Sequence, residues 1–441
     1  IEEWLKQHNI VEVECLVADM TGNARGKFIR VEKFNKDEAR LPECVLLQTV
    51  TGEYCDEHDE LVSPKDQDMI LVADPNTARV IPWATKATAQ IIHNCETTDG
   101  KPHPISSRNV LRRVLALYDD MGIKPVIAPE VEFYLVEKNN DHHTELLPPL
   151  GRSGRSESAG QSYGIEALYE FEPILDNLRE YCALQELNID AIVHESGTAQ
   201  MEINFRHGDP LDLADQVFTF KRTMRQVAYS HGVYATFMAK PMSDEPGCSM
   251  HIHQSLVDKD SGENLFVNSD GEPTDTFMHY LGGLQKYTPN LISFYAPNVN
   301  SYRRLTKHLS APINMHWGFD NRTVGLRIPD SEVAATRIEN RFSGIDANPY
   351  LAIAASLASG LAGIIHKLKP DEAYEGNACD EEITIARSLE EALDGLDDLG
   401  DVADILGQEF ITAYQMVKYN ESEEFNRVIS TWERENLLLN V

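Results

Sequence analysis

The stretch from Ala128 to Val136 constrains the fold most. It places Glu130 and Glu132 two residues apart in a run that is otherwise apolar, β-branched and aromatic. In a β-strand both side chains point to one face, and carboxylates on a buried face need a cation or hydrogen-bond donors to offset their desolvation. A lone pair of this kind is more often the solvent-facing side of an edge strand. The rest of the chain must decide between these interpretations.

Two further segments repeat the same-face pattern. The segment 193–205 is predicted to form two short strands around a Ser-Gly turn, and each strand carries one acid, Glu195 or Glu202. Further along, His251 and His253 share one face of a predicted strand. Such a histidine pair can bind a metal ion or a phosphate group, although hydrogen-bonded neutral histidines are at least as common in cores. The chain thus offers four strand-borne carboxylates and two imidazoles.

Arginines accompany these acids. If the segment 336–342 is a strand, Arg337, Glu339 and Arg341 point to one face. A carboxylate between two guanidinium groups is either part of a surface salt-bridge ladder or a metal ligand flanked by phosphate-binding arginines. Further arginines lie near predicted turns, at Arg303, Arg304, Arg322 and Arg327. Oxygen ligands with one or two imidazoles suit magnesium or manganese better than structural zinc, so these residues favour metal-assisted phosphoryl transfer.

Composition excludes several other classes of protein. The formal net charge of -32 argues against sequence-independent nucleic-acid binding, which needs a basic surface. The seven cysteines lack C-x-x-C spacing, so we expect reduced thiols rather than disulfides or a thiolate zinc site. We expect no apolar run long enough to span a bilayer, and residues 1–7 read as an amphipathic helix rather than a signal peptide. A cytoplasmic protein without membrane contact is therefore expected.

The chain is predicted to contain two domains of the α+β class. A β-hairpin over residues 11–31 and later short strands form a small domain, 1–100, that ends in a Pro- and Gly-containing linker. The larger domain, 101–441, alternates strands with helices packed on one sheet. Its longest helices are expected at 173–187, 211–231 and 348–367, with a first helix capped by Ser106 or Ser107. The acidic segment 370–401 is expected to be a solvated insertion.

Six motifs, in this order, resemble the glutamine synthetase family in its bacterial type I layout. They are Pro-Glu-Val-Glu-Phe at 129–133, His-Glu then Gln-Met-Glu at 194–202, Met-His-Ile-His-Gln-Ser at 250–255, Asn-Ser-Tyr-Arg-Arg-Leu at 300–305, Asn-Arg-Thr-Val-Gly-Leu-Arg-Ile-Pro at 321–329, and Arg-Ile-Glu-Asn-Arg-Phe at 337–342. The resemblance covers essentially the whole chain. It implies a small β-grasp-like N-terminal domain and a larger catalytic domain with helices on an antiparallel sheet.

The resemblance also implies an ATP-dependent ligase that phosphorylates the γ-carboxylate of glutamate and passes the acyl group to an amine. By match to the motifs, one metal ion, Mg²⁺ or Mn²⁺, would be held near glutamate by Glu132, Glu195 and Glu202, and a second near ATP by Glu130, His251 and Glu339. Arg304 matches the position that binds the substrate carboxylate, and Gly247 survives from a glycine-rich loop that contacts glutamate. The phosphoryl group would meet Arg322 and Arg341, and the nucleotide would meet His253, Ser255 and Arg337.

The chain departs from the ammonia-using members of the family. Ser310 stands where they carry a loop glutamate, and residues 49–52 lack their Asp-Gly-Ser-Ser run, so two acids expected to hold ammonium are absent together. This favours the γ-glutamylpolyamine or γ-glutamylputrescine synthetase-like branch, whose larger amine we expect to pack against Tyr163 and Tyr54. Glu53 or the departing phosphate would take the amine's proton. The alternatives are glutamine synthetase itself and a catalytically silent ring-forming relative.

The family places each active site between two subunits of a ring. The resemblance therefore implies a homo-oligomer of hexameric rings, stacked in pairs. The apolar residues 437–441 at the end of the sequence give this expectation weak support of their own.

Overall fold

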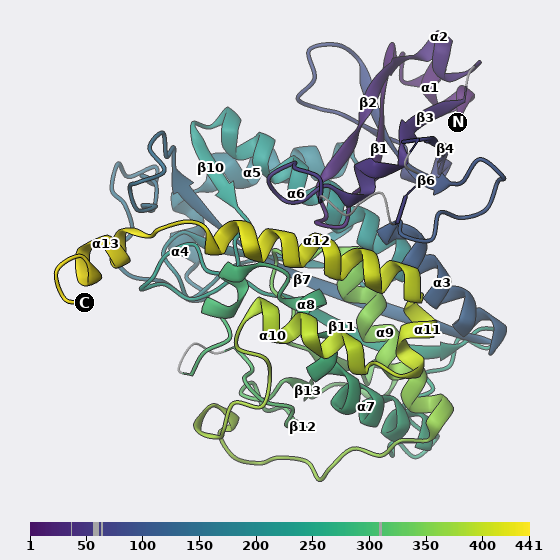
Figure 1. Ribbon diagram of the computed structural model, residues 1–441, viewed down its shortest axis with the longest axis vertical. Coiled ribbons are helices and arrows are strands. Elements are labelled where there is room, and N and C mark those ends of the chain that lie inside the picture. Colours follow the sequence, from purple (N-terminus) through teal and green to yellow (C-terminus); the bar gives the residue numbers. More distant parts are fainter. Residues whose placement is uncertain (37, 56–60, 63–64, 308–310) are drawn as a thin grey trace.

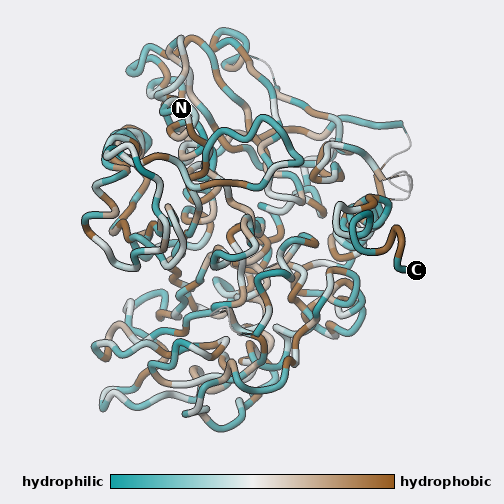
Figure 2. Tube along the Cα trace, turned by 90° about the vertical axis from the view of Figure 1, so that its left-hand side faces the viewer, coloured by the Kyte–Doolittle hydropathy of each residue, from teal (hydrophilic) through white to brown (hydrophobic). Residues whose placement is uncertain are grey.

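The computed structural model describes residues 1–36, 38–55, 61–62, 65–307 and 311–441. Within these ranges the chain forms two sheets with helices packed between and around them (Figure 1). Hydrophobic segments run through the interior, and hydrophilic ones dominate the outer loops (Figure 2). This is the mixed α and β architecture that the sequence predicts.

The first sheet is built from residues 12–96 and has the strand order β2-β1-β6-β4-β3, with β5 paired to β6. Its strands are β1 (Glu12–Ala18), β2 (Ala24–Arg30), β3 (Ala39–Pro42), β4 (Asp68–Ala73), β5 (Arg79–Val80) and β6 (Thr88–Glu96). Helix α1 (Glu2–Gln7) precedes the sheet and α2 (Val31–Phe34) follows β2. The predicted hairpin is confirmed as β1 and β2, and its turn is fixed by Asp19, which accepts hydrogen bonds from the backbone N–H groups of Thr21 and Asn23.

The second sheet has the order β12-β13-β14-β11-β7-β9-β8, with β10 paired to β7. Its strands are β7 (Ile123–Glu137), β8 (Ile189–His194), β9 (Gln200–Phe205), β10 (Val233–Thr236), β11 (Met250–Asp258), β12 (Trp317–Phe319), β13 (Leu326–Ile328) and β14 (Ile338–Asn340). All pairs are antiparallel except β12 with β13. The long strand β7, which carries the opening Glu-x-Glu, lies between β11 and β9.

Helices cover the face of β7 opposite its two acids. Phe133 of β7 lies 6.1 Å, ring to ring, from Phe220 on α6 (Pro210–Ser230). The other helices of the segment 107–366 are α3 (Ser107–Asp120), α4 (Ile165–Glu170), α5 (Glu172–Leu184), α7 (Asp275–Tyr287), α8 (Ile292–Tyr295) and α9 (Pro349–His366). The three long helices predicted from the sequence are confirmed as α5, α6 and α9. Ser106 is the N-cap residue of α3, but its side chain makes no capping hydrogen bond.

Helix α9 corrects one sequence expectation. It is long and apolar enough to cross a membrane, which we did not expect of any segment, yet 83% of it is buried inside the structure. Its residues from Pro349 to Gly363 are all buried, against α3, α6 and α7 among others. The apolar run is therefore explained by its place as a core helix.

The acidic segment 370–401 is also different from the prediction, because it packs on the core. Leu389, Leu393, Leu396 and Leu399 within it are all buried. Helix α10 (Leu389–Asp394) is capped by Ser388, whose hydroxyl accepts from the Glu391 N–H, and α11 (Asp401–Leu406), α12 (Gln408–Asn426) and α13 (Thr431–Leu437) follow. The leucines of the segment 370–401 face inward while its acids face solvent. Its high content of charged residues hides this periodicity in the sequence.

A buried ion-pair network joins the two sheets. Arg108 of α3 pairs with Asp215 of α6 at 2.7 Å and with Asp74, next to the first sheet, at 2.8 Å. Tyr350 donates to Asp215 at 2.6 Å. The elements of the first sheet end at Glu96 and those around the second begin at Ser107. These bounds support our proposal of domains at 1–100 and 101–441.

Candidate active site

One cluster of acids and imidazoles lies where β7, β11 and β14 run side by side. The register sets His251 opposite Glu130 and His253 opposite Glu339. Glu130 Oε2 lies 3.3 Å from His251 Nδ1, and its Oε1 lies 3.0 Å from His253 Nε2. Glu339 Oε1 is 3.5 Å from His251 Nδ1, and the Glu339 side chain is 1% exposed. The same-face pattern in three strands therefore produces one polar cluster inside the fold.

A second cluster of acids adjoins the first along β7 and β9. Glu132 lies opposite Glu202 in the antiparallel register, and both are buried. Glu132 accepts hydrogen bonds from the Ser249 N–H at 2.7 Å and from Gln200 at 3.3 Å. Glu195 lies one residue beyond the end of β8, in the turn, so the expectation that all four acids lie on strands is wrong for this one. It still faces Glu132 and Glu202 closely enough to repel them.

The two clusters differ in how far their protein neighbours neutralise the carboxylates. Burial, and then repulsion from Glu195 and Glu202, raises the pKa of Glu132. Burial and the Glu130 charge raise the pKa of Glu202 to about 8. Burial opposes ionisation of Glu130 and Glu339 too, but histidines and Arg341 outweigh it and lower their pKa values. These raised pKa values show that the protein's own groups do not offset the charge of the second cluster.

The donor set fits divalent cations. Among the described residues of these clusters, two groups of three have ligand atoms that all lie within 4.8 Å of one another, Glu130 with Glu202 and His251, and Glu130 with His253 and Glu339. Carboxylate oxygens with one or two imidazoles suit hard or borderline divalent ions such as Mg²⁺ and Mn²⁺. Uncompensated carboxylates and fitting geometry thus agree on metal binding here. His253, expected beside the nucleotide, lies as near to these carboxylates as His251 does.

A buried arginine borders the second cluster. Arg304 is 2% exposed, and its guanidinium donates to the Phe342 carbonyl and, at 3.4 Å, to Ser249 Oγ. Burial lowers the pKa of Arg304, and the Glu132 charge opposes that shift. A Cβ on Gly247 would lie 2.4 Å from Arg304 Cγ, so only glycine allows the Arg304 stem its present path. Arg304 thus offers a planar donor group next to the carboxylates.

Comparison with known proteins identifies this arrangement. The family model described as glutamine synthetase, catalytic domain, matches residues 104–437. The chain belongs to the glutamine synthetase family. The catalytic domain of that family makes it an ATP-dependent ligase that forms carbon–nitrogen bonds.

Several relatives match this glutamine synthetase family member over most of its length. A glutamate–isopropylamine ligase of a Pseudomonas species is 33% identical, over 98% of this chain and 96% of its own. The gamma-glutamylputrescine synthetase PuuA of Escherichia coli is 33% identical, over 100% and 94%. A glutamine synthetase of Pyrococcus abyssi is 37% identical, over 78% and 77%. Ligand-free GmaS, a solved structure, aligns with a TM-score of 0.85 at 26% identity, over 100% and 99%.

Some site residues of this family member were missed in the sequence. Arg327, counted there only as one of several arginines, donates from Nη1 to Glu339 Oε2 at 2.8 Å because β13 pairs with β14. Glu157 accepts from the Ala199 N–H at 2.6 Å and lies 3.1 Å from His194, the neighbour of Glu195. It thereby ties the polar loop 151–160 to the turn that carries Glu195. No local sequence signal marks either contact.

The remaining predicted residues lie at different distances from the clusters. Arg341 bonds Glu339 Oε1 at 2.5 Å, and Arg337 Nε lies 3.2 Å from His253 Nδ1. Ser255 follows His253 on the same face of β11. Arg322 is exposed in the turn between β12 and β13 and lines a separate cavity of about 530 Å³.

The expected amine pocket is not assembled within one chain. Tyr163 lies beside the turn that carries Glu195, because its backbone N–H donates to the His194 carbonyl at 2.8 Å, and its side chain is 67% exposed. Tyr54 instead lines a cavity of about 570 Å³ against α12, together with Glu53. The two tyrosines therefore belong to different surfaces of one subunit. Ser310 lies outside the described residues.

Proposed function

We propose that the protein joins the γ-carboxylate of L-glutamate to an amine, with hydrolysis of ATP to ADP and phosphate. The observation that carries this proposal is the convergence of Glu132, Glu195 and Glu202 beside the buried guanidinium of Arg304. Divalent cations stabilise three like-charged acids of this kind, and a buried arginine is suited to a carboxylate. Metal ions and a carboxylate site together are what phosphorylation of a carboxylate requires.

The acids divide into two ligand sets in this proposal. Glu132, Glu195 and Glu202 would hold one Mg²⁺ or Mn²⁺ ion near glutamate, and Glu130, His251 and Glu339 would hold another near ATP. Bound there, such ions neutralise phosphate charge as it develops in phosphoryl transfer. The position of His253, 3.0 Å from Glu130, lets it share in the second set as well as contact the nucleotide.

Phosphorylation is the first chemical step. Arg304 orients glutamate through its α-carboxylate, with Gly247 leaving room for the arginine stem. A γ-carboxylate oxygen attacks the terminal phosphorus of ATP, the bond to the β–γ bridging oxygen breaks, and ADP leaves. Arg341 lies beside Glu339 and is placed to offset charge on the transferring group. Arg322 could assist only if its turn moved inward, while Ser255 and Arg337 contact the nucleotide.

Amide formation is the second step. The amine nitrogen attacks the acyl carbon of γ-glutamyl phosphate, phosphate leaves, and the nitrogen loses one proton to the phosphate or to an acid such as Glu53. We propose an alkylamine or polyamine as the acceptor because the relatives that match the full chain are named for isopropylamine and putrescine. Methylene groups of such an amine would be buried against Tyr163, and against Tyr54 of a neighbouring subunit, at about 0.8 kcal/mol each.

Glutamine synthesis from ammonia is the second candidate. The specific observation in its favour is the 37% identity with a Pyrococcus glutamine synthetase, although over only 78% of the chain. Ammonium gains its affinity from charge-assisted hydrogen bonds to anions. The loss of acids at 49–52 and at Ser310 disfavours it.

The decisive experiment compares acceptors at one pH. Purified protein with glutamate, ATP and Mg²⁺ or Mn²⁺ is given ammonium, isopropylamine, putrescine or ethylamine, and phosphate release and product mass are measured. We expect kcat/KM for an organic amine to exceed that for ammonium by about a hundredfold, since two lost charged partners cost a few kcal/mol. A tenfold advantage for ammonium would establish glutamine synthetase instead. No turnover with any acceptor would establish the silent relative.

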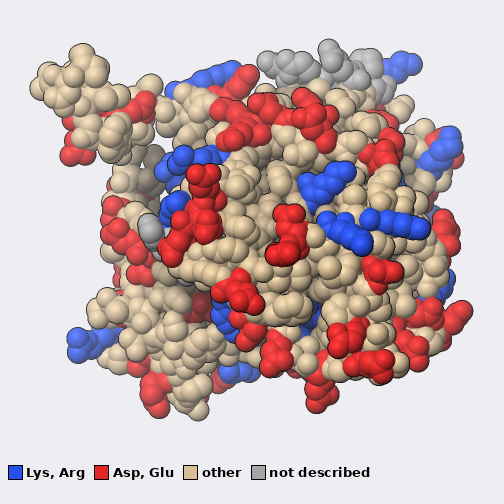
Figure 3. Space-filling view, turned by 90° about the horizontal axis from the view of Figure 1, so that it is seen from below, with Lys and Arg blue, Asp and Glu red and all other residues tan. Residues whose placement is uncertain are grey.

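We also propose a homo-oligomer, a dodecamer of two stacked hexameric rings. The C-terminal tail stands away from the body at the left of Figure 1 and forms the mostly uncharged protrusion at the upper left of Figure 3. Its apolar residues are exposed: Val428, Ile429, Trp432, Leu438, Leu439 and Val441. An apolar surface of this kind is typical of a subunit contact. Light scattering on the full chain and on a chain ending at residue 427 tests this, and an active monomer would contradict it.

A further inference from the structure

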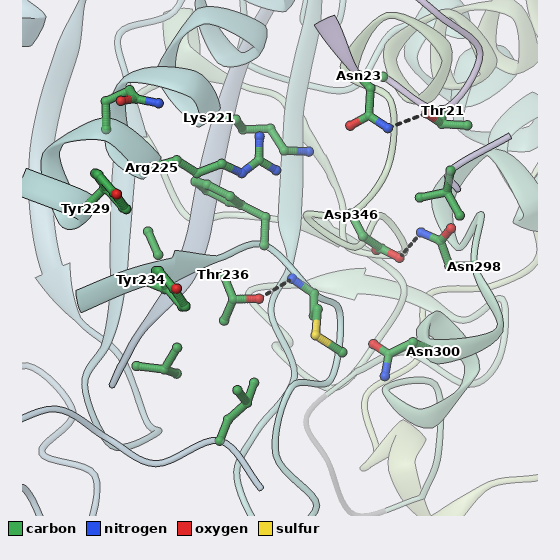
Figure 4. A pocket seen from close by; sticks show the side chains of 18 residues that line it. Thr21, Asn23, Lys221, Arg225, Tyr229, Tyr234, Thr236, Asn298, Asn300 and Asp346 are labelled. Atoms are coloured by element: carbon green, nitrogen blue, oxygen red, sulfur yellow. Dashed lines mark hydrogen bonds between the residues drawn. The ribbon is translucent and has the colours of Figure 1, made fainter. Parts of the chain in front are cut away.

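A further cavity, of about 680 Å³, lies between helix α6 and the segment that precedes Arg304 (Figure 4). Helix α6 supplies one wall with Lys221 and Arg225, and the segment from Asn298 to Asn300 with Asp346 supplies the opposite wall. The hairpin turn between β1 and β2 and the strand β10 complete it. A volume of this size accommodates a small organic molecule.

The α6 wall is positively charged, and the charge of Asp346 on the opposite wall acts on Lys221 without forming a salt bridge to it. Lys221 Nζ donates to two backbone carbonyls, of Ile345 at 2.6 Å and of Ala347 at 3.3 Å. Arg225 lies 5.0 Å from the centroid of the Phe237 ring, and Lys221 Nζ lies 5.6 Å from it. Among the described residues, neither cation has a carboxylate within salt-bridge distance, whereas the next residue, Arg222, pairs with Glu14 at 2.6 Å.

Such a wall is unusual in this chain, whose net charge is -32. Acidic side chains dominate the face seen in Figure 3. Burial, and then the charge of Arg225, lowers the pKa of Lys221 to about 7, which shows that its charge is poorly stabilised by the protein alone. A bound anion would supply the missing partner for both cations.

The remaining walls select the kind of anion. Besides the two cations, Asp346 and uncharged polar side chains, the cavity is lined by apolar and aromatic side chains that include Phe237, Tyr229 and Tyr234. An inorganic anion such as phosphate would leave these surfaces in contact with water. A carboxylate attached to an apolar or aromatic body would meet the cations with one end and bury the other.

Hydrogen bonds link the wall that carries Asp346 to the segment that carries Arg304. Asp346 accepts from Asn298 at 2.8 Å and from Ser301 at 2.5 Å, and Ser301 lies three residues before Arg304. Arg304 in turn donates to the carbonyl of Phe342, in the segment that leads to the Lys221 contacts at 345 and 347. A ligand that moves either wall therefore moves the segments that hold Arg304.

We propose that this cavity is an effector site for a small organic carboxylate with an apolar or aromatic body. Binding to Lys221 and Arg225 would shift the segments 298–304 and 342–347 and so change the affinity of Arg304 for its carboxylate ligand. This coupling rests on the proposed function, whereas binding itself does not.

Binding is tested first, by isothermal titration calorimetry on the full-length oligomer saturated with ADP and Mg²⁺. Phenylacetate is the probe, and phenylacetamide is its neutral match. We expect saturable binding of phenylacetate at millimolar or lower concentration, and Arg225→Gln should weaken it about tenfold, the value of one charge-assisted contact. Arg225→Lys should restore part of the affinity. Arg179→Gln on α5, an equal change of charge at an exposed salt bridge, should leave it unchanged.

Three results would contradict the proposed site. They are no heat of binding at phenylacetate concentrations up to its solubility limit, an affinity for phenylacetamide equal to that for phenylacetate, or an unchanged affinity for phenylacetate in an Arg225→Gln protein whose melting temperature is also unchanged. Coupling is tested next, by glutamate kinetics with the best amine. We expect saturating phenylacetate to change KM for glutamate at least twofold in the parent and not in Arg225→Gln. Binding without any change in KM would overturn the effector role. If the protein binds phenylacetate but turns over no amine, the proposed function is refuted and the binding site is not.

Discussion

Glu132 on β7 and Glu202 on β9 face each other across an antiparallel pair of strands, and each is no more than 9% exposed. Two buried carboxylates at adjacent positions destabilise the fold unless a cation or a proton lies between them. Burial and the Glu130 charge raise the pKa of Glu202 to about 8, so the charged form of Glu202 is unfavourable in the folded protein. Repulsion of this kind lowers the free energy of unfolding, and a bound cation would restore it.

Glu202→Gln should therefore stabilise the protein in EDTA and remove its stabilisation by metal. We expect a gain of about 1–3 kcal/mol at pH 7 without metal, together with loss of turnover. Melting temperatures with EDTA and with Mn²⁺ give both quantities. Glu166→Gln, at an exposed position on α4, is the matched control. A Glu202→Gln protein that melts lower than the parent in EDTA would contradict this interpretation.

Gly247→Ala should damage glutamate binding more than folding. The added methyl group would lie 2.4 Å from Arg304 Cγ and 2.8 Å from the Ala239 carbonyl oxygen, so the arginine must shift. We expect KM for glutamate to rise about tenfold or more, since misplacing a charged hydrogen bond costs 1.5–3 kcal/mol. Gly208→Ala, whose Cβ would meet only Leu213 at 3.7 Å, should behave as the parent in the same assay. If KM for glutamate is unchanged in Gly247→Ala, Arg304 does not bind glutamate.

Much of the cluster was predictable because strand periodicity acts locally. The two-residue spacing alone places Glu130 with Glu132, and His251 with His253, on shared faces of β7 and β11. Spacing does not reveal which strands become neighbours. The structure supplies that step through the order β14-β11-β7-β9.

Contacts that depend on long-range register escaped prediction. Arg327 meets Glu339 only because β13 pairs with β14, and Glu157 meets His194 only because an irregular loop folds back. The acidic segment 370–401 was misassigned because its inward leucines are sparse among charges. Tyr54 and Tyr163 were assigned to one amine pocket by resemblance to the family. A resemblance in sequence does not tell on which subunit each residue of the pocket lies.

A buried ion pair on α12 fixes the N-terminal loop that should face the amine. Glu421 accepts from the Val50 N–H at 2.6 Å and pairs with Lys418 at 2.7 Å, with side chains only 6% and 1% exposed. Glu421→Ala leaves Lys418 buried without a carboxylate, so we expect a loss of about 3–5 kcal/mol. Urea denaturation measures the loss.

The double variant Lys418→Met with Glu421→Leu should recover part of that stability, because it removes both buried charges. It cannot restore the hydrogen bond to Val50. Hydrogen exchange at the Val50 amide should therefore be fast in Glu421→Ala and in the double variant, although their free energies of unfolding differ. Slow exchange in Glu421→Ala would show that the loop is held by other contacts.

Acid should destabilise the N-terminal sheet through His93. This residue on β6 is 2% exposed, its Nδ1 lies 2.9 Å from the Ile91 carbonyl, and burial lowers its pKa to about 4. Between pH 6.5 and pH 4 the unfolded chain binds a proton at this histidine and the folded chain does not. Stability from His93 is therefore complete above pH 6.5 and is lost as pH falls toward 4.

The loss from this one group should be about 2 kcal/mol between pH 7 and pH 5. His93→Gln removes the titration, so the stability difference between the variant and the parent should narrow by that amount over the same interval. Urea midpoints at both pH values measure it, and His207→Gln, at an exposed position, controls for the loss of an imidazole. Because both curves contain every other titrating group, only His93 contributes to the change in their difference. A difference that stays constant from pH 7 to pH 5 would show that the His93 imidazole gains a proton without leaving its buried position.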